Sequence, residues 1–377
     1  MIEPADRARA LGISREAIEL WDASDVVDAH VESFVWSRVL GYDLGRRHGS
    51  GLAGGCFYSQ ADLPRMVDAA LSGVVLSVAT NPFRRRERRT GTLLANLARL
   101  RADVDAHPGT VVVADHAGYR QARQEGKLAC FLAVQGGNAL GSPADLARIP
   151  DDVVSRITLV HLTASPLGRS SAPGPRSPRG GRGLTSLGAE LVEAMNARRV
   201  IVDLAHISPE GFWDALDVHD RGQPAIVSHT GVRGVHDVWR NLDDAQVRAI
   251  GALGGVVGVM FHSGFLGDRF WSGRAEAVVD HLAHIVRIAG EDSAAIGSDY
   301  DGLIVPPTDL RTVTRLPVLA QRMLDRGFGA ERIAKVLGRN YLRVVEAVRP
   351  GRPDSNHGGN PDGNHGGTPE VGPTPAS

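Results

Sequence analysis

Eight short apolar segments recur along the whole chain, and stretches with the spacing of amphipathic helices separate them. The segments cover residues 26–32, 74–80, 129–135, 156–162, 199–205, 225–229, 256–261 and 294–299. Strands that alternate with helices predict a parallel sheet, and eight such units are typical of a closed barrel. We therefore predict an α/β fold of the TIM-type (β/α)8 barrel class.

Two of the helical stretches have clear boundaries. The first covers 185–197, where Thr185 can cap the helix and the apolar residues recur at helical spacing. The second covers 243–253 and stops before two consecutive glycines. The last helices, near 330–337 and 340–348, are expected to pack outside the barrel.

The chain divides into one folded domain and a tail. We assign residues 1–349 to the barrel, because the alternation of strands and helices continues to that point. Residues 350–377 are Gly, Pro, Asn and Ser with almost no apolar side chains, which predicts a disordered C-terminal tail. Two Gly- or Pro-rich inserts, at 41–60 and 165–183, follow strand ends and are expected to form loops over the active rim.

Composition excludes several classes of partner. Of the 377 residues, 42% are hydrophobic and 23% charged, which is ordinary for a globular protein with a large core. The net charge of −1 gives no reason to expect nucleic acid or an anionic membrane surface as a partner. The two cysteines form no disulfide framework, and neither a signal peptide nor a membrane-spanning segment is apparent, so a cytoplasmic location is expected.

Most of the apolar segments end on a side chain that can bind a metal or transfer a proton. In a parallel barrel the C-terminal ends of all strands lie on one rim, where the active site is built. Side chains from distant parts of the sequence should therefore meet there, which predicts a metal-dependent hydrolase. The side chains in question are His30, Glu32, Gln135, His161, His206, His229, His262 and Asp299.

The spacing of these residues indicates how they can share metal ions. His30 and Glu32 are two apart on a strand, so they point to the same face and offer one nitrogen and one oxygen ligand. His206 and His229 follow successive strands and can share a second ion. Asp299 ends the eighth segment, beside the first, and can take a proton from a water whose pKa a metal lowers from ~16 towards ~7.

Several sequence blocks resemble the membrane (renal) dipeptidases and their bacterial relatives, which are metal-dependent barrels of the amidohydrolase type. The resemblance covers most of residues 26–345, and the order of its blocks is specific. The blocks are VVDAHVES, LACFLAVQGGNAL, RITLVHLTASPLG, GLTSLGAELVEAMNARRVIVDLAHIS, PAIVSHTGVRGVHDVWRNLDDAQVRAI, GGVVGVMF, HIVRIAGEDSAAIGSDYDG and IAKVLGRNYLRV.

The resemblance implies a metal site with two ions. The first ion would be bound by the pair His30 and Glu32, with Asp299 nearby. The second would be bound by His206 and His229.

The resemblance also implies roles in catalysis and substrate binding. Asp299, in the block GSDYDG, would act in proton transfer. His161 would help to hold the substrate and the tetrahedral oxyanion. Arg240, in the block RNL, would bind the C-terminal carboxylate of the substrate, which suits the forked guanidinium group.

Two positions depart from the pattern of these relatives. Glu32 stands where they have aspartate, and Gln135 stands where they have the glutamate that bridges both metals. A neutral carboxamide binds through a single carbonyl oxygen and bridges poorly, so the second ion should bind less tightly. We therefore expect a cofactor of the Zn²⁺ type, as one or two divalent ions.

The leading interpretation is a hydrolase that uses hydroxide generated at the metal to cleave the amide bond of a dipeptide or similar small amide. Two alternatives stay open. One is a repurposed one-metal enzyme for another small substrate, as in specialised metabolism, and the other is a catalytically inactive binding protein. No sequence feature decides whether the chain forms a homodimer, and His48, His236 and His262 are expected to have structural roles.

Overall fold

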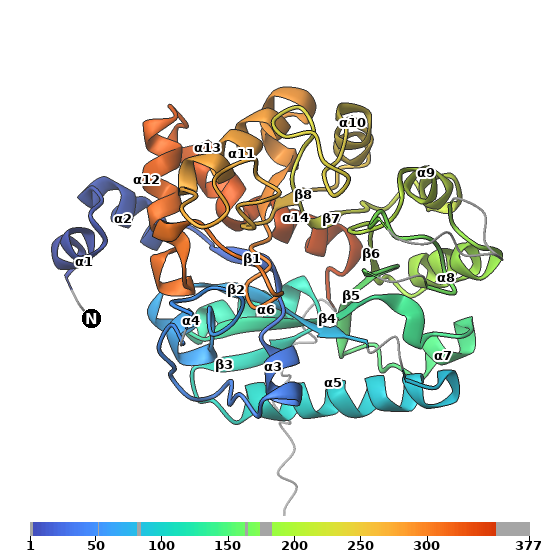
Figure 1. Cartoon of the computed structure of the whole chain (residues 1–377). Coiled ribbons are helices and arrows are strands. Elements are labelled where there is room, and N and C mark those ends of the chain that lie inside the picture. Colours follow the sequence, from blue (N-terminus) through green and yellow to red (C-terminus); the bar gives the residue numbers. More distant parts are fainter. Residues whose placement is uncertain (1–2, 52, 81–83, 163–164, 174–182, 352–377) are drawn as a thin grey trace, which may run out of the picture.

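Eight parallel strands surrounded by helices form the centre of the computed structural model, which describes residues 3–51, 53–80, 84–162, 165–173 and 183–351 (Figure 1). Hydrogen-bonded neighbours follow the order β1-β2-β4-β5-β6 and β7-β8-β9. The strands are β1 Val27–Val31, β2 Gly73–Ala79, β4 Leu128–Gln135, β5 Val154–Thr158, β6 Ile201–Asp203, β7 Val227–Thr230, β8 Val257–Val259 and β9 Ala294–Ile296.

Backbone hydrogen bonds close these two sheets into a ring. Between β6 and β7, Leu204 N donates to Ile226 O at 2.9 Å. Between β9 and β1, Asp299 N donates to His30 O at 3.0 Å, and Glu32 N donates to Tyr300 O at 2.8 Å. Each of the eight predicted segments overlaps one strand of the ring, so the prediction of a TIM-type barrel is confirmed.

A ninth strand, β3 Thr110–Val113, was not predicted from the sequence. It pairs in parallel with Leu128–Phe131, the first half of β4, whereas β5 pairs with the second half of the same strand. β3 therefore lies beside the ring without being a member of it. Its four residues, TVVV, carry β-branched side chains but end on no polar side chain of the rim.

The helices surround the ring in the alternating order that the sequence predicts. They are α1 Pro4–Leu11, α2 Arg15–Ala23, α3 Phe34–Val39, α4 Leu63–Asp68, α5 Arg89–Asp105, α6 His116–Gln124, α7 Pro143–Ala147, α8 Ser186–Ala197, α9 Pro209–Val218, α10 Asp244–Ala252, α11 Ala275–Ala289, α12 Val318–Asp325, α13 Ala330–Ala334 and α14 Asn340–Val348.

The boundaries of the two clearest helices follow from their caps. Thr185 Oγ1 accepts a hydrogen bond from Gly188 N at 3.1 Å at the start of α8, as expected. Asp243 and Gln246 form a reciprocal capping box at the start of α10.

The C-terminal helices differ from the prediction in one respect. A π-helical turn, Lys335–Arg339, joins α13 directly to α14. Gly338 lies in this turn against the start of β1, and a Cβ atom at this position would come within 2.1 Å of Asp25 O. The absence of a side chain therefore lets the turn pack against both strands at the closure of the ring, β1 and β9.

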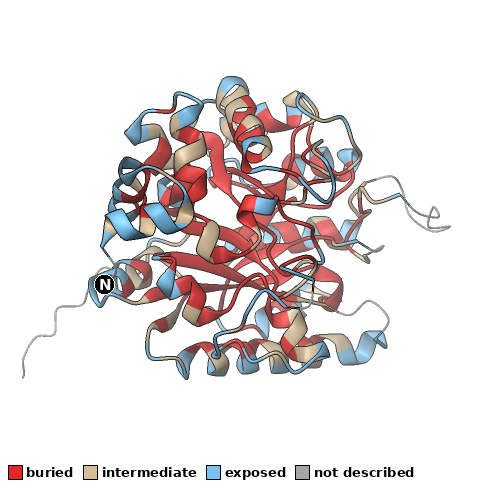
Figure 2. Ribbon diagram, turned by 60° about the vertical axis from the view of Figure 1, so that its left-hand side comes forward, coloured by how far each residue is buried: buried red, intermediate tan, exposed pale blue. Residues whose placement is uncertain are grey.

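The core fills the ring and the space between the strands and the helices. Figure 2 shows buried residues throughout the strands and exposed residues on the outer faces of the helices. Every residue of β4 is buried. No helix within the described residues is long and apolar enough to cross a membrane.

The two long loops cover the rim where the strands end. In the first, Phe57 N donates to Ile304 O at 2.8 Å, which places residues of 41–60 against the segment after β9. In the second, Ser171 N donates to His206 O at 2.7 Å. Residues 174–182 of this loop and 352–377 of the expected tail lie outside the described residues.

Candidate metal centre

Six of the predicted site residues meet at the C-terminal rim of the ring. They come from five different strands or from the turns that directly follow them, and their side chains are buried. They are His30, Glu32, Gln135, His206, His229 and Asp299.

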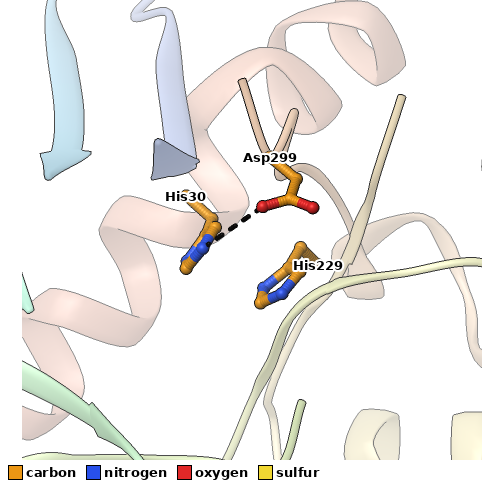
Figure 3. Close-up of side chains that lie close together, drawn as sticks. All are labelled: His30, His229 and Asp299. Carbon is orange, nitrogen blue, oxygen red and sulfur yellow. Dashed lines mark ion pairs between the residues drawn. The ribbon is translucent and has the colours of Figure 1, made fainter. Parts of the chain in front are cut away.

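His30, Glu32 and Asp299 form one side of this cluster. His30 Nε2 lies 3.5 Å from Glu32 Oε1 and 3.6 Å from Asp299 Oδ1. Figure 3 shows His30, Asp299 and His229 facing a common point, and ligand atoms of these three residues lie within 4.8 Å of one another. Two ligands of a tetrahedral zinc ion, at 2.0–2.2 Å from the metal, are about 3.3–3.6 Å apart. The spacing therefore suits a divalent cation.

Hydrogen bonding supports the same fit. His30 Nε2 and Glu32 Oε1 are buried, and neither has a hydrogen-bond partner among the residues that the structure describes. Buried polar atoms are nearly always paired, so an unpaired nitrogen and oxygen that face each other are typical of a ligand site. The residues present are thus suited to hold the metal.

His206, His229 and Gln135 form the other side of the cluster. His206 Nε2 and His229 Nε2 lie 2.8 Å apart, which is a hydrogen-bonding distance. The carboxamide nitrogen of Gln135 lies 3.1 Å from His206 Nε2 and 3.4 Å from His229 Nε2. The sequence analysis noted Gln135 as a departure from the membrane dipeptidase pattern, but the direction of its amide group was not predictable from the sequence.

Backbone conformation marks two of these residues. His206 has φ of +65° and Asp299 has φ of +60°. Residues other than glycine are uncommon in the left-handed region, where Asn, Asp and His occur more often than the rest, and such conformations cluster at functional sites. The turns after β6 and β9 therefore direct these side chains towards the centre, and their backbone conformation costs some stability.

A buried ion pair lies beneath the centre, inside the ring. Arg156 on β5 and Asp203 on β6 are both fully buried, and Arg156 Nη1 donates to Asp203 Oδ2. Arg156 Nη2 donates to Ser77 Oγ at 3.1 Å and lies 3.0 Å from His30 Nδ1. The sequence analysis did not assign these two residues to the site, although a charge in the middle of an apolar strand was a visible signal.

The ion pair also reaches the second side of the centre. Ser228 Oγ donates to Asp203 Oδ2 at 2.7 Å and lies 2.8 Å from His229 Nδ1. Because the hydroxyl proton goes to Asp203, His229 Nδ1 must donate to Ser228. The lone pair of His229 is then on Nε2, which faces the centre.

Burial shifts the pKa of both carboxyl groups upwards. The pKa of Asp299 lies well above its usual value, first because the group is buried and then because Glu32 is close. Burial raises the pKa of Glu32 to about 7, although the charges of Arg156 and Arg38 oppose the shift. Both groups thus hold protons more readily than exposed carboxyl groups.

The pKa values of the histidines shift in the direction that favours metal binding. Burial, together with the positive charge of Arg240, lowers the pKa values of His206 and His229 well below the usual value. Burial and the charge of Arg156 do the same for His30. All three imidazoles are therefore neutral at pH 7, as metal ligands must be.

His161 and Arg240 lie beside the second side of the centre. The rings of His161 and His206 meet edge to face with centroids 4.8 Å apart, and burial together with Arg240 lowers the pKa of His161 to about 4. Arg240 is buried and donates from Nη2 to His229 O at 2.6 Å, while its Nε has no hydrogen-bond partner within the described part of the chain.

Histidines that the resemblance did not explain make local contacts. His262 Nδ1 accepts a hydrogen bond from Val305 N at 3.2 Å, and its ring packs edge-on against Phe265. His48 stacks on Tyr42 with ring centroids 3.9 Å apart. Neither belongs to the cluster at the centre.

Comparison with known proteins agrees with this geometry. The sequence profile of the membrane dipeptidase family (peptidase family M19) matches residues 14–356. The chain belongs to this family. A metallopeptidase from Rhodobacter sphaeroides, determined with a phosphinate mimic of the dipeptide L-Ala-D-Ala, superimposes on 86% of the chain and 99% of its own, with 25% identity and a TM-score of 0.76.

Two further relatives are similar in sequence over shorter ranges. A protein encoded in the pqqA 5' region of Klebsiella pneumoniae is 37% identical over 177 residues, which is 46% of this chain and 64% of that protein. A Schizosaccharomyces pombe protein named as an uncharacterized dipeptidase is 31% identical over 241 residues, which is 63% of this chain and 58% of that protein. The chain thus matches about three fifths of the length of these relatives.

Proposed function

We propose that this membrane dipeptidase family member is a metal-dependent hydrolase that cleaves the amide bond of a dipeptide or a similar small amide. The observation that carries the proposal is the convergence of His30, Glu32 and Asp299 around a point suited to a divalent cation. The dipeptide mimic bound by the related metallopeptidase supports the choice of substrate class.

The metal ion and Asp299 would have separate roles in the reaction. When bound, a divalent cation supplies the Lewis acidity that makes water a nucleophile at neutral pH. Asp299, whose Oδ1 lies 3.6 Å from His30 Nε2 in the centre, accepts a proton from the attacking water and returns it to the leaving amine. Asp299 is thus the proposed catalytic acid and base.

Two residues beside the centre would act on the substrate. His161 is neutral at pH 7 and donates a hydrogen bond to the oxygen that becomes negative in the transition state. Arg240 presents its unpaired Nε–H, and it pairs with the C-terminal carboxylate of the substrate. Binding at two points fixes the scissile bond relative to Asp299.

The test is direct. Purified protein is loaded with Zn²⁺ and assayed against a panel of L,L- and L,D-dipeptides, with the Asp299→Asn variant as the matched control. We expect turnover of at least one dipeptide by the native chain and none by the variant. Turnover by neither, or equal turnover by both, would refute the proposal.

Gln135 favours a second candidate, an enzyme of the same fold that acts on another small substrate. Its carboxamide faces His206 and His229, where the relatives have a bridging carboxylate. Turnover of small amides or esters, but of no dipeptide, would support this candidate. Zn²⁺ as the native metal, a cytoplasmic location and a homodimer stay predictions.

A further inference from the structure

The two sides of the metal centre differ in how their ligand atoms are engaged. On the first side, His30 Nε2 and Glu32 Oε1 lie 3.5 Å apart, and no described residue forms a hydrogen bond with either atom. On the second side, His206 Nε2 and His229 Nε2 are only 2.8 Å apart, and the carboxamide nitrogen of Gln135 faces both. Only the first side has the spacing of ligands around a cation.

The chemistry of Gln135 explains this difference. An amide NH₂ group donates hydrogen bonds and carries no lone pair for a metal, so it faces an imidazole nitrogen as a cation would. A glutamate at the same position would instead present oxygen ligands. Gln135 is fully buried at the end of β4, and whichever way its amide turns it offers at most one oxygen ligand.

We infer that this chain binds one divalent cation, through His30, Glu32 and Asp299 with His229 as a further ligand beside them, and that the neutral Gln135 carboxamide occupies the place of a second cation beside His206. The inference rests on the proposed function for the identity of the site. It concerns the number of ions, which can be measured whether or not a substrate is known.

The experiment counts ions directly. Full-length protein is stripped with a chelator, reloaded with Zn²⁺ alone, desalted, and analysed by plasma mass spectrometry and native mass spectrometry. We expect about one ion per chain for the native sequence and about two for Gln135→Glu, which restores a bridging carboxylate. Gln124→Glu makes the same chemical change on the exposed side of α6 and should leave the count at one.

Two histidine variants test which side holds the ion. His206→Asn should keep one ion, and asparagine tolerates the left-handed backbone at this position. His30→Asn should lose the ion. Circular dichroism and a cooperative melting transition without Zn²⁺ establish for each variant that the fold is intact, so that an unfolded variant is not counted as a lost site.

Several results would overturn the inference. Two ions in the native chain would do so, as would loss of the ion in His206→Asn. A single ion in folded Gln135→Glu would refute the role given to the carboxamide. Failure to hydrolyse any dipeptide would remove the proposed function but would leave the ion count, and hence this inference, standing.

Discussion

Arg156 offers a quantitative test of the buried network beneath the centre. The substitution Arg156→Met removes the guanidinium group but keeps an extended side chain, and it leaves the Asp203 carboxylate fully buried without its counter-charge. Breaking a buried ion pair from one side typically costs about 3–5 kcal/mol. Four neutral donors still bond to Asp203, from Thr158, from Ser228 (twice) and from Ala205, so we expect about 3 kcal/mol, at the lower end of the range.

Urea denaturation of the metal-free protein measures this loss, with Asp203→Asn and the double variant completing a cycle. In the double variant no charge is left unpaired, so its loss of unfolding free energy should be smaller than the sum of the single losses by about 2 kcal/mol or more. Arg148→Met removes an exposed partner of Asp145 and should change stability by less than about 1 kcal/mol. Additive losses in the cycle would show that the ion pair does not have the assigned role.

Three further predictions concern the centre itself. Asp299→Asn should lower kcat by at least about 100-fold while circular dichroism is unchanged, because asparagine fits the backbone but cannot accept the proton; a smaller loss would assign proton transfer to another group. Zn²⁺ binds the ionised forms of Glu32 and Asp299, and burial raises the pKa of both carboxyl groups, so affinity measured by chelator competition should fall as the pH is lowered from 8 to 5.5; a flat profile over this range would contradict this. Arg240→Lys should raise KM about tenfold or more with a smaller effect on kcat, since an ammonium cannot form two parallel hydrogen bonds with a carboxylate; an unchanged KM would place the substrate carboxylate elsewhere.

The ring of strands was predictable because its signal is repeated. Each buried strand reads as an apolar segment, and the ends of parallel strands must meet on one rim, so the meeting of His30, His206, His229 and Asp299 followed from their positions in sequence. β3 was not predictable in this way, because it pairs with half of one strand and contributes nothing to the rim.

The contacts around the centre were beyond sequence reasoning for a different reason. Pattern can place Gln135 at a strand end, but the direction of its amide depends on which neighbours offer lone pairs. Likewise, Arg156 and Asp203 lie on adjacent strands, and only the register of β5 against β6 sets their side chains against each other. Such details depend on three-dimensional neighbours that the order of residues does not specify.

The place where the ring closes has a mechanical consequence. His30 lies in the first strand and Glu32 directly follows it, whereas Asp299 follows the last strand. Backbone hydrogen bonds from Asp299 N to His30 O and from Glu32 N to Tyr300 O join these two edges. An ion shared across the edges would act as a cross-link that ties the beginning of the polypeptide to its end. Binding of the ion should therefore slow amide hydrogen exchange most between β1 and the segment after β9. Release of the ion should allow these two edges to separate before any other pair of strands.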